Sequence, residues 1–302
     1  MIILVLNIGS SSIKYTVYAH NDGVLVDTEH GQMTGIGTPL SAWSSSRTLQ
    51  NHTTTQTFET HQQALQHLSQ HLAQHAPIRA VVHRVVHGGP QLTSPCRIDK
   101  KVLAQIKQTI PLAPLHNPIQ VLGIEHAQKN FRYADHIAVF DTSFHHTIPK
   151  HIHTYPLPKA FSTQHALRKY GFHGSSYEYV LGQAQQHFDQ QDLNLIICHL
   201  GSGASVCAIQ HSQSWDTSMG FTPCGGLIMG TRPGDLDPGL IAYLQNNISD
   251  QTADLDHFLN QECGLKGLCG HSDMRAIEHA ANQGDAACQL AIDMFCYRVQ
   301  CY

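Results

Sequence analysis

The chain has 302 residues, of which 41% are hydrophobic and 13% charged, so it can bury a substantial core and we expect two domains. Its formal net charge of −4 argues against a nucleic-acid-binding protein, because such proteins neutralise phosphates with a basic surface. No apolar run is long enough for a membrane span, no signal segment opens the chain, and the nine cysteines form no Cys-x-x-Cys pair. These features predict a soluble cytoplasmic protein with reduced thiols.

The first 150 residues alternate between strand and helix patterns. This alternation predicts an α/β domain with helices packed on a sheet. Residues 31–57 are polar and too weakly patterned to predict an element. The predicted strands are 2–6, 13–19, 23–29, 79–86 and 136–140, and the predicted helices are 60–75, 100–109 and 118–130.

Histidine is unusually common, with 24 residues. His67, His71 and His75 are four residues apart, which places them on one face of the predicted helix 60–75. They could bind a metal ion, but a solvated Gln/His face is the preferred interpretation, because leucines mark the opposite, apolar side of the helix.

Proline-rich residues 149–158 mark the predicted domain boundary, which gives domains 1–150 and 151–302. The second domain is predicted to contain a helix at 175–187, a hairpin at 193–209 and a glycine-rich stretch at 220–239. A mostly helical region follows, and its last helix, 286–300, has no glycine cap.

Residues 4–15 and 195–206 share one pattern: an apolar strand, a Gly/Ser turn and a second strand. Such a turn exposes backbone N–H groups and hydroxyls, which suit a phosphate. Two copies predict that the chain binds a nucleotide polyphosphate. Neither standard nucleotide-binding motif occurs, so the two turns themselves would have to hold the phosphates. In the first copy, Asn7, Ser10, Ser12 and Lys14 supply polar groups, although a plain polar turn with an exposed lysine would look similar.

Two arginines lie in unusual settings. Arg84 interrupts an apolar strand, and Arg232 lies in a loop rich in glycine and aspartate. A buried guanidinium needs an anionic partner, so each could bind a substrate carboxylate or a transferring phosphoryl group. The alternative is an internal salt bridge, for Arg232 with Asp235 or Asp237.

Two further residues are candidates for the chemistry. Asp141 follows a strand at its C-terminal end, where it could bind Mg²⁺ or cap a turn. His173 precedes a glycine at a helix start and could contact an anion, while Ser175 could cap that helix. A hydrolase is excluded by the absence of a Gly-x-Ser-x-Gly segment.

Together these segments resemble the acetate kinase family of short-chain carboxylate kinases, within the actin-like, sugar kinase and Hsp70 superfamily. The resemblance implies an α/β fold of duplicated ribonuclease-H-like domains with mixed sheets flanked by helices. It rests on NIGSSSIK at 7–14, HRVVHGG at 83–89, APLHNP at 113–118, FDTSFH at 140–145, YGFHG at 170–174 and MGTRPGDLDP at 229–238.

The resemblance further implies reversible transfer of the ATP γ-phosphoryl group to acetate, giving acetyl phosphate and ADP, with Mg²⁺ or Mn²⁺ and in a homodimer. Arg84 and Arg232 would bind the carboxylate, His173 the phosphoryl oxygens, and Asp141 and Asn7 would lie at the metal. The other implied site residues are Val86, Leu115, Phe172 and Pro223 around the methyl group, and Ser10, Ser12, Lys14, His199, Gly201, Ser202 and Gly203 around the phosphates.

The chain also departs from the family pattern. Ser202 replaces an asparagine, and the stretch 222–226 lacks a glutamate. The family continues beyond the helix that contains Tyr297 and Arg298, so an incomplete second domain, low stability and weak ATP binding are expected. The alternatives to an acetate kinase are therefore an inactive truncated pseudoenzyme, a fragment of a longer kinase, or a propionate kinase.

Overall fold

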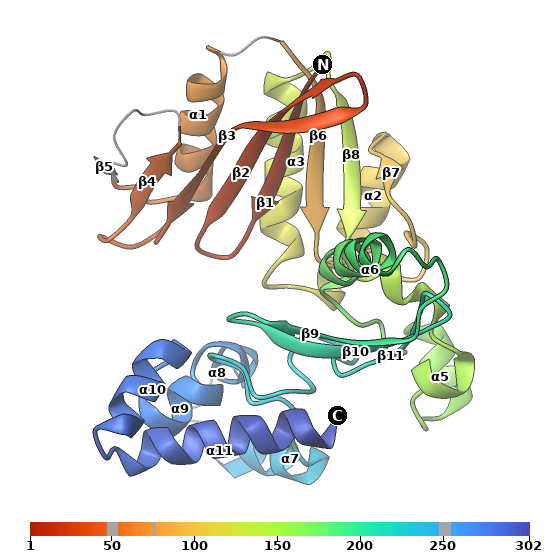
Figure 1. Cartoon of the computed structure of the whole chain (residues 1–302), viewed down its shortest axis with the longest axis vertical. Helices are drawn as coiled ribbons and strands as arrows, with labels where there is room; N and C mark the ends of the chain where they lie inside the picture. Colours follow the sequence, from red (N-terminus) through yellow and green to blue (C-terminus); the bar gives the residue numbers. More distant parts are fainter. Residues whose placement is uncertain (47–53, 75–76, 248–254) are drawn as a thin grey trace. The chain divides into compact units, whose positions relative to one another are not determined.

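The computed structural model describes all residues except 47–53, 75–76 and 248–254. The chain divides into two compact units, Met1–Ser143 and Phe144–Tyr302, which are described separately (Figure 1). No described helix combines the length and the apolar character that a bilayer crossing requires.

Unit 1 contains a mixed sheet whose described strands follow the order β5-β4-β3-β2-β1-β6-β8-β7. Its antiparallel part is a meander of successive strands. The turn between β2 and β3 contains Asp22 and Gly23, which both have positive φ, as a tight hairpin requires. The central strand β1 pairs in parallel with β6, and β6 with β8. The strands are β1 (Ile2–Ile8), β2 (Ile13–Asn21), β3 (Val24–Thr34), β4 (Ala42–Ser45), β5 (Thr54–Thr55), β6 (Ile78–Val85), β7 (Cys96–Arg97) and β8 (Asp135–Phe140).

The helices of unit 1 are α1 (His61–Leu72), α2 (Lys100–Gln108) and α3 (Asn117–Asn130), with the short 3-10 helix η1 (Ile110–Leu112). A second 3-10 helix, η2 (Ser143–Thr147), begins at the last residue of unit 1 and continues into unit 2. Helix α3 packs on β1 and β6 and contacts both α1 and α2. Strand alternation turns Leu4, Leu6 and Ile8 into the core beneath these helices, so Asn7 belongs to the opposite face of the sheet.

Strand β4 lies in the polar region where the sequence predicted no element. Its Trp43 is buried and stacks on Tyr15, with ring centroids 5.6 Å apart. The edges of His67 and His71 in α1 contact the same indole ring. The interpretation of these histidines as a solvated face was therefore wrong, and His75 lies outside the described residues.

Glu29 is a fully buried carboxylate beneath α1. Its Oε1 accepts hydrogen bonds from the Tyr15 hydroxyl at 2.6 Å and the Ser45 hydroxyl at 2.8 Å, and His71 Nε2 lies 2.5 Å away. Burial alone would raise the pKa of Glu29, but these partners outweigh it and lower the pKa to about 2. The carboxylate therefore ties the sheet to α1.

Two histidines form a second buried pair between β6 and β8. His83 Nε2 lies 3.1 Å from His136 Nδ1, and His136 Nε2 lies 3.2 Å from the Phe131 carbonyl oxygen. His136 therefore donates to Phe131 and accepts from His83, which satisfies both nitrogens of a neutral His136 ring. Burial, helped by the neighbouring His136, lowers the pKa of His83 to about 3.

Unit 2 contains a sheet of order β11-β10-β9 in its described residues. The predicted hairpin forms β9 and β10, and β11 extends it as a third antiparallel strand. Helix α6 packs its Tyr177 and Leu181 against Ile197 and Cys207 of this sheet. The bounds are α4 (Lys150–His153), α5 (Lys159–Gln164), α6 (Gly174–Phe188), β9 (Leu195–Leu200), β10 (Ala204–Gln210) and β11 (Gln213–Thr217).

After the glycine-rich loop, the described residues from Pro238 onward are mostly helical, as the sequence predicted. Helices α9, α10 and α11 enclose a small core around Leu265, Ile277 and Cys288 (Figure 1). The helices are α7 (Pro238–Asn247), α8 (Leu255–Gln261), α9 (Gly264–Cys269), α10 (Met274–Asn282) and α11 (Ala286–Cys301).

We expect mild acid to destabilise the protein through His83. Its pKa is about 3 when folded and 6.5 when exposed, so below pH 6.5 the unfolded state binds more protons. The free energy of unfolding should fall as the pH falls towards 3, by up to about 1.4 kcal/mol per pH unit. Urea unfolding between pH 7.5 and 5 avoids the titration of Glu29. If the unfolding free energy of His83→Leu depended on pH as steeply as that of the wild type, the role of His83 would be contradicted. His211→Gln, a change at an exposed histidine, is the control and should keep the wild-type slope.

Removal of one donor to the buried carboxylate should destabilise unit 1. Tyr15→Phe keeps the ring that stacks on Trp43 but leaves Glu29 with one partner fewer. The expected loss is about 1–3 kcal/mol of unfolding free energy at pH 7. The half-exposed Tyr18 on the same strand offers the matched change Tyr18→Phe, which should cost less than Tyr15→Phe in the same urea titration.

Candidate active site

The first Gly/Ser turn joins β1 to β2. The Gly9 amide donates to the Ser12 carbonyl at 2.8 Å, and His61 Nε2 of α1 lies 2.9 Å from the Gly9 carbonyl oxygen. These contacts hold the turn, while Ser10 and Lys14 stay exposed. The predicted phosphate-binding groups of this turn are therefore accessible from solvent.

Arg84, Asp141 and Asn7 meet on the face of the sheet opposite the helices. Arg84 donates to both Asp141 carboxylate oxygens, from Nε at 2.9 Å and Nη2 at 2.6 Å, and from Nη1 to the Asn7 amide oxygen at 3.0 Å. The Asp141 carboxylate is almost fully buried, and its charge raises the pKa of Arg84. The internal salt bridge left open for Arg84 is present, with Asp141 as the partner.

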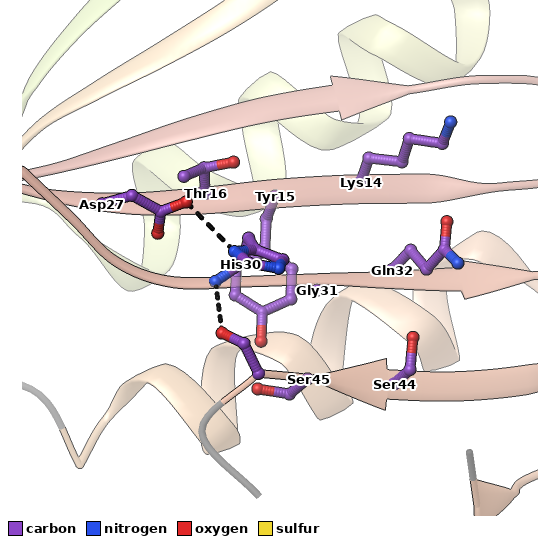
Figure 2. Close-up of a pocket in the computed structure, with 10 residues that line it drawn as sticks. Lys14, Tyr15, Thr16, Asp27, His30, Gly31, Gln32, Ser44 and Ser45 are labelled. Carbon is purple, nitrogen blue, oxygen red and sulfur yellow. Dashed lines mark hydrogen bonds and ion pairs between the residues drawn. The ribbon is translucent and has the colours of Figure 1, made fainter. Parts of the chain in front are cut away.

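A polar row extends from this cluster across the sheet. Lys14 pairs with Asn7 on one side and with Gln32 on the other, and Gln32 pairs with Ser44. Figure 2 shows Lys14, Gln32 and Ser44 pointing to the same side of three neighbouring strands, away from the ring of Tyr15. Sequence reasoning missed Gln32 and Ser44, because the third strand was predicted to end at residue 29 and β4 was not predicted.

These residues border a pocket of about 610 Å³ in unit 1. An ion pair of 3.0 Å between His30 Nδ1 and Asp27 lies within it (Figure 2). The lining residues are Lys14, Tyr15, Thr16, Asp27, His30, Gly31, Gln32, Ser44, Ser45 and Ser46.

Two residues predicted to line an apolar pocket also belong to unit 1. Val86 is buried just after β6, and its amide donates to the Gln120 side chain at 2.9 Å. Leu115 is half-buried in the turn that precedes α3.

The second Gly/Ser turn, in unit 2, lies against the loop that carries Arg232. The Gly201 amide donates to the Gly203 carbonyl at 3.0 Å, and the Gly230 amide donates to the Ser202 carbonyl at 3.1 Å. His199 precedes the turn, with its Nδ1 2.9 Å from the Ser176 hydroxyl. The chain therefore brings this turn and the Arg232 loop together.

Arg232 and His173 converge above Gly203. A Cβ atom at position 203 would lie 2.7 Å from Arg232 Nη2 and 3.2 Å from His173 Nε2. The guanidinium and the imidazole both pack closely over Gly203, so a larger residue at that position would clash with them. His173 itself has a φ of 61° and a ψ of 18°, a left-handed conformation that is uncommon for a non-glycine residue.

Arg232 lacks a carboxylate partner among the described residues. Its Nη1 donates to the Pro223 carbonyl at 2.6 Å, and burial lowers the pKa of its guanidinium. Asp235 accepts from the Gly226 amide and the Tyr302 hydroxyl, while Asp237 caps the start of α7. The alternative of a salt bridge from Arg232 to Asp235 or Asp237 is therefore wrong.

Phe172 and Pro223, the other two predicted pocket residues, belong to unit 2. Phe172 is almost fully buried, and its carbonyl lies 2.9 Å from His145 Nε2. Pro223 is half-buried, and its carbonyl oxygen orients Arg232.

A pocket of about 670 Å³ opens beside the second turn. Sequence reasoning missed most of it, because its far wall comes from the start of α10 and from α11, which carry no phosphate-binding motif. It is lined by Leu200, Gly201, Ser202, Met229, Gly230, Leu265, Ser272, Asp273, Met274, Arg275 and Phe295.

Asp141 and Asn7 offer oxygen atoms of the kind that Mg²⁺ prefers. Among the described residues, no group of three His, Cys, Asp or Glu side chains could hold a metal by itself. Mg²⁺ in phosphoryl-transfer sites is usually held by one or two carboxylates together with substrate phosphates. The buried Asp141 carboxylate beside the Asn7 amide oxygen fits that limited role.

Comparison with known proteins gives one consistent answer. The sequence model of the Acetokinase family matches residues 2–302. The acetate kinase of Syntrophobacter fumaroxidans is 41% identical over all of this chain and 76% of its own length, and that of Desulfotalea psychrophila is 45% identical over 71% of this chain and 54% of its own. A propionate kinase from Francisella tularensis superposes with a TM-score of 0.92 at 38% identity, over 99% of this chain and 78% of its own.

The chain thus spans about three quarters of the length of the relatives that it matches throughout. The α/β fold with a mixed sheet flanked by helices, predicted from the resemblance, is confirmed by these matches. The motif segments, the fold and the full-length matches agree that this chain belongs to the acetokinase family, whose members are phosphotransferases with a carboxylate acceptor.

Proposed function

We propose that this chain transfers the γ-phosphoryl group of ATP reversibly to acetate, giving acetyl phosphate and ADP. The observation that carries the proposal is Arg232, a half-buried arginine with no carboxylate partner among the described residues. It lies with His173 Nε2 above a glycine-rich turn. A cation left without an anion in such a place is suited to an anionic substrate.

In this proposal Arg84 and Arg232 bind the acetate carboxylate and stabilise the transferring group, and His173 donates to its oxygens. Phosphoryl transfer depends mainly on alignment and charge neutralisation, which fixed donors provide without covalent chemistry. Pro223 holds the Arg232 guanidinium through its carbonyl, and Asp141 holds that of Arg84. Both cations are therefore oriented before substrate binds.

Asp141 and Asn7 would hold Mg²⁺ together with the ATP phosphates. The ion, when bound, neutralises charge that develops on the phosphates. Both side chains already have fixed orientations, because Arg84 contacts each of them. Mn²⁺ could replace Mg²⁺, because it accepts the same oxygen ligands.

The two Gly/Ser turns would bind the ATP phosphates. In the first turn the groups are the Ser10 and Ser12 hydroxyls and the Lys14 ammonium. In the second they are His199 and residues 201–203, and the neighbouring pocket of about 670 Å³ would accept the rest of the nucleotide. Its volume lies in the range of ordinary small-molecule sites.

Val86, Leu115, Phe172 and Pro223 would surround the methyl group of acetate. One extra methylene in an apolar pocket changes binding by only ~1–3 kcal/mol, so propionate is expected to be a poorer but detectable acceptor. The family resemblance also supports a cytoplasmic homodimer.

The proposal is tested by hydroxylamine trapping of acetyl phosphate formed from MgATP and acetate. Arg232→Ala removes the unpaired guanidinium and should lower kcat/KM by roughly 10³–10⁵, the range known for arginines that stabilise phosphoryl transfer. Arg132→Ala, which changes an arginine that lies over the ring of Tyr133, is the control and should keep wild-type activity. Equal rates for wild type and Arg232→Ala would refute the assigned role, and no product from the wild type would refute the activity.

A second test concerns the nucleotide pocket of unit 2. Ser272→Trp places a large ring in the pocket and should raise the KM for ATP at least 10-fold while the KM for acetate changes little. His271→Trp is the matched control, because His271 is exposed and adjacent but does not line the pocket. Unchanged ATP affinity in Ser272→Trp, by steady-state kinetics or direct nucleotide binding, would place the nucleotide elsewhere.

A further inference from the structure

We propose that Tyr177 is a positioning residue that acts on His173 through the hydroxyl of Ser205. This inference deepens the proposed function, on which it rests, because it explains how the phosphoryl-contacting imidazole would be held. Tyr177 belongs to none of the sequence motifs, and Ser205, within the second Gly/Ser pattern, received no role from the sequence.

The geometry is a chain of two short contacts. His173 Nδ1 lies 2.7 Å from Ser205 Oγ, and the Tyr177 hydroxyl lies 2.5 Å from the same oxygen. Tyr177 and Ser205 are both fully buried, so water cannot substitute for either partner. His173 and Tyr177 are four residues apart at the start of α6, and Ser205 belongs to β10, so the sheet and the helix both fix the arrangement.

The two contacts are not independent, because Ser205 has a single hydroxyl proton. If Ser205 donates to His173 Nδ1, its oxygen must accept from Tyr177. Burial raises the pKa of Tyr177 well above its usual value, so the phenol keeps a proton that it can donate to Ser205. The sequence of donations from Tyr177 to Ser205 to Nδ1 leaves the proton of a neutral His173 on Nε2.

That tautomer suits the site. Nε2 faces the space above Gly203 that it shares with Arg232 Nη2, and phosphoryl oxygens there can only accept hydrogen bonds. The titratable or charged groups beside the ring are His199, which stacks on it at 4.1 Å between centroids, Arg232 and Tyr177. The nearby guanidinium disfavours a second positive charge and so favours the neutral ring, which can donate to a phosphoryl oxygen only if its single proton lies on Nε2.

His173 has a strained left-handed backbone, so the contacts of its side chain must help to hold the residue in place. A φ of 61° is unfavourable for histidine, and no side chain caps α6 at this residue. The link through Ser205 to Tyr177 and the stacking of His199 together hold the ring against that strain. Loss of the Tyr177 hydroxyl would free Ser205 to either donate or accept, so neither the tautomer nor the orientation of His173 would be fixed.

The first test reads the imidazole directly and needs no catalysis. Long-range ¹H–¹⁵N NMR of the full chain should show His173 protonated on Nε2 in the wild type and in Tyr179→Phe, an exposed tyrosine of the same helix. Tyr177→Phe should shift the tautomer ratio and the pKa of His173. An Nδ1-protonated ring in the wild type, or spectra that are identical in Tyr177→Phe, would overturn the proposal even if the chain proved inactive.

The second test is kinetic. Tyr177→Phe should lower kcat by roughly 10–100-fold, as is typical for removal of a partner that orients a functional histidine, with little change in either KM. In a His173→Ala background the same change should have almost no further effect, because its target is absent. An equal loss in both backgrounds would show a general structural role instead. Failure of acetyl phosphate formation in the wild type would count against the proposed function and leave the NMR result to decide this inference.

Discussion

The candidate site depends most on how the charge of a half-buried guanidinium is compensated, and the chain uses two different solutions. Arg84 is paired with the buried Asp141 carboxylate, so its charge is satisfied within the protein. Arg232 has a backbone carbonyl and, among the described residues, no carboxylate. Because a buried charge without a counter-ion is expensive, Arg232 gains most from an anionic ligand. Under the proposed function both arginines bind the substrate carboxylate, Arg84 already held by Asp141 and Arg232 with its charge still open to an anion.

Strand alternation explains why the sequence predicted so much of unit 1. Apolar side chains at Leu4, Leu6 and Ile8 face the helices, so Asn7 between them must face the other way, and Arg84 on β6 follows the same rule. The alternation of apolar and polar residues is therefore enough to assign Asn7 and Arg84 to one face. The partner that the sequence left open, Asp141 for Arg84, follows β8, and only the pairing of β6 with β8 brings the two together.

What the sequence could not predict came from contacts between distant residues. Strand β4 is short and polar, and its burial depends on Trp43 stacking on Tyr15 from another strand. The helical pattern placed His71 on a solvated face, but the buried Glu29 lies 42 residues away and reverses that assignment. Likewise, the salt bridge considered for Arg232 was plausible from sequence proximity alone. It fails because Asp235 and Asp237 satisfy backbone amides instead.

Tyr177 illustrates how one residue can serve both packing and chemistry. Its ring fills the core between α6 and the sheet of unit 2, so helical periodicity explains its presence without reference to any function. A buried phenol must also satisfy its hydroxyl, and here Ser205 does so. Since Ser205 has only one proton to give, satisfying the tyrosine constrains the histidine on the other side. In the proposed arrangement, the need to pair the buried Tyr177 hydroxyl therefore also fixes the orientation of His173.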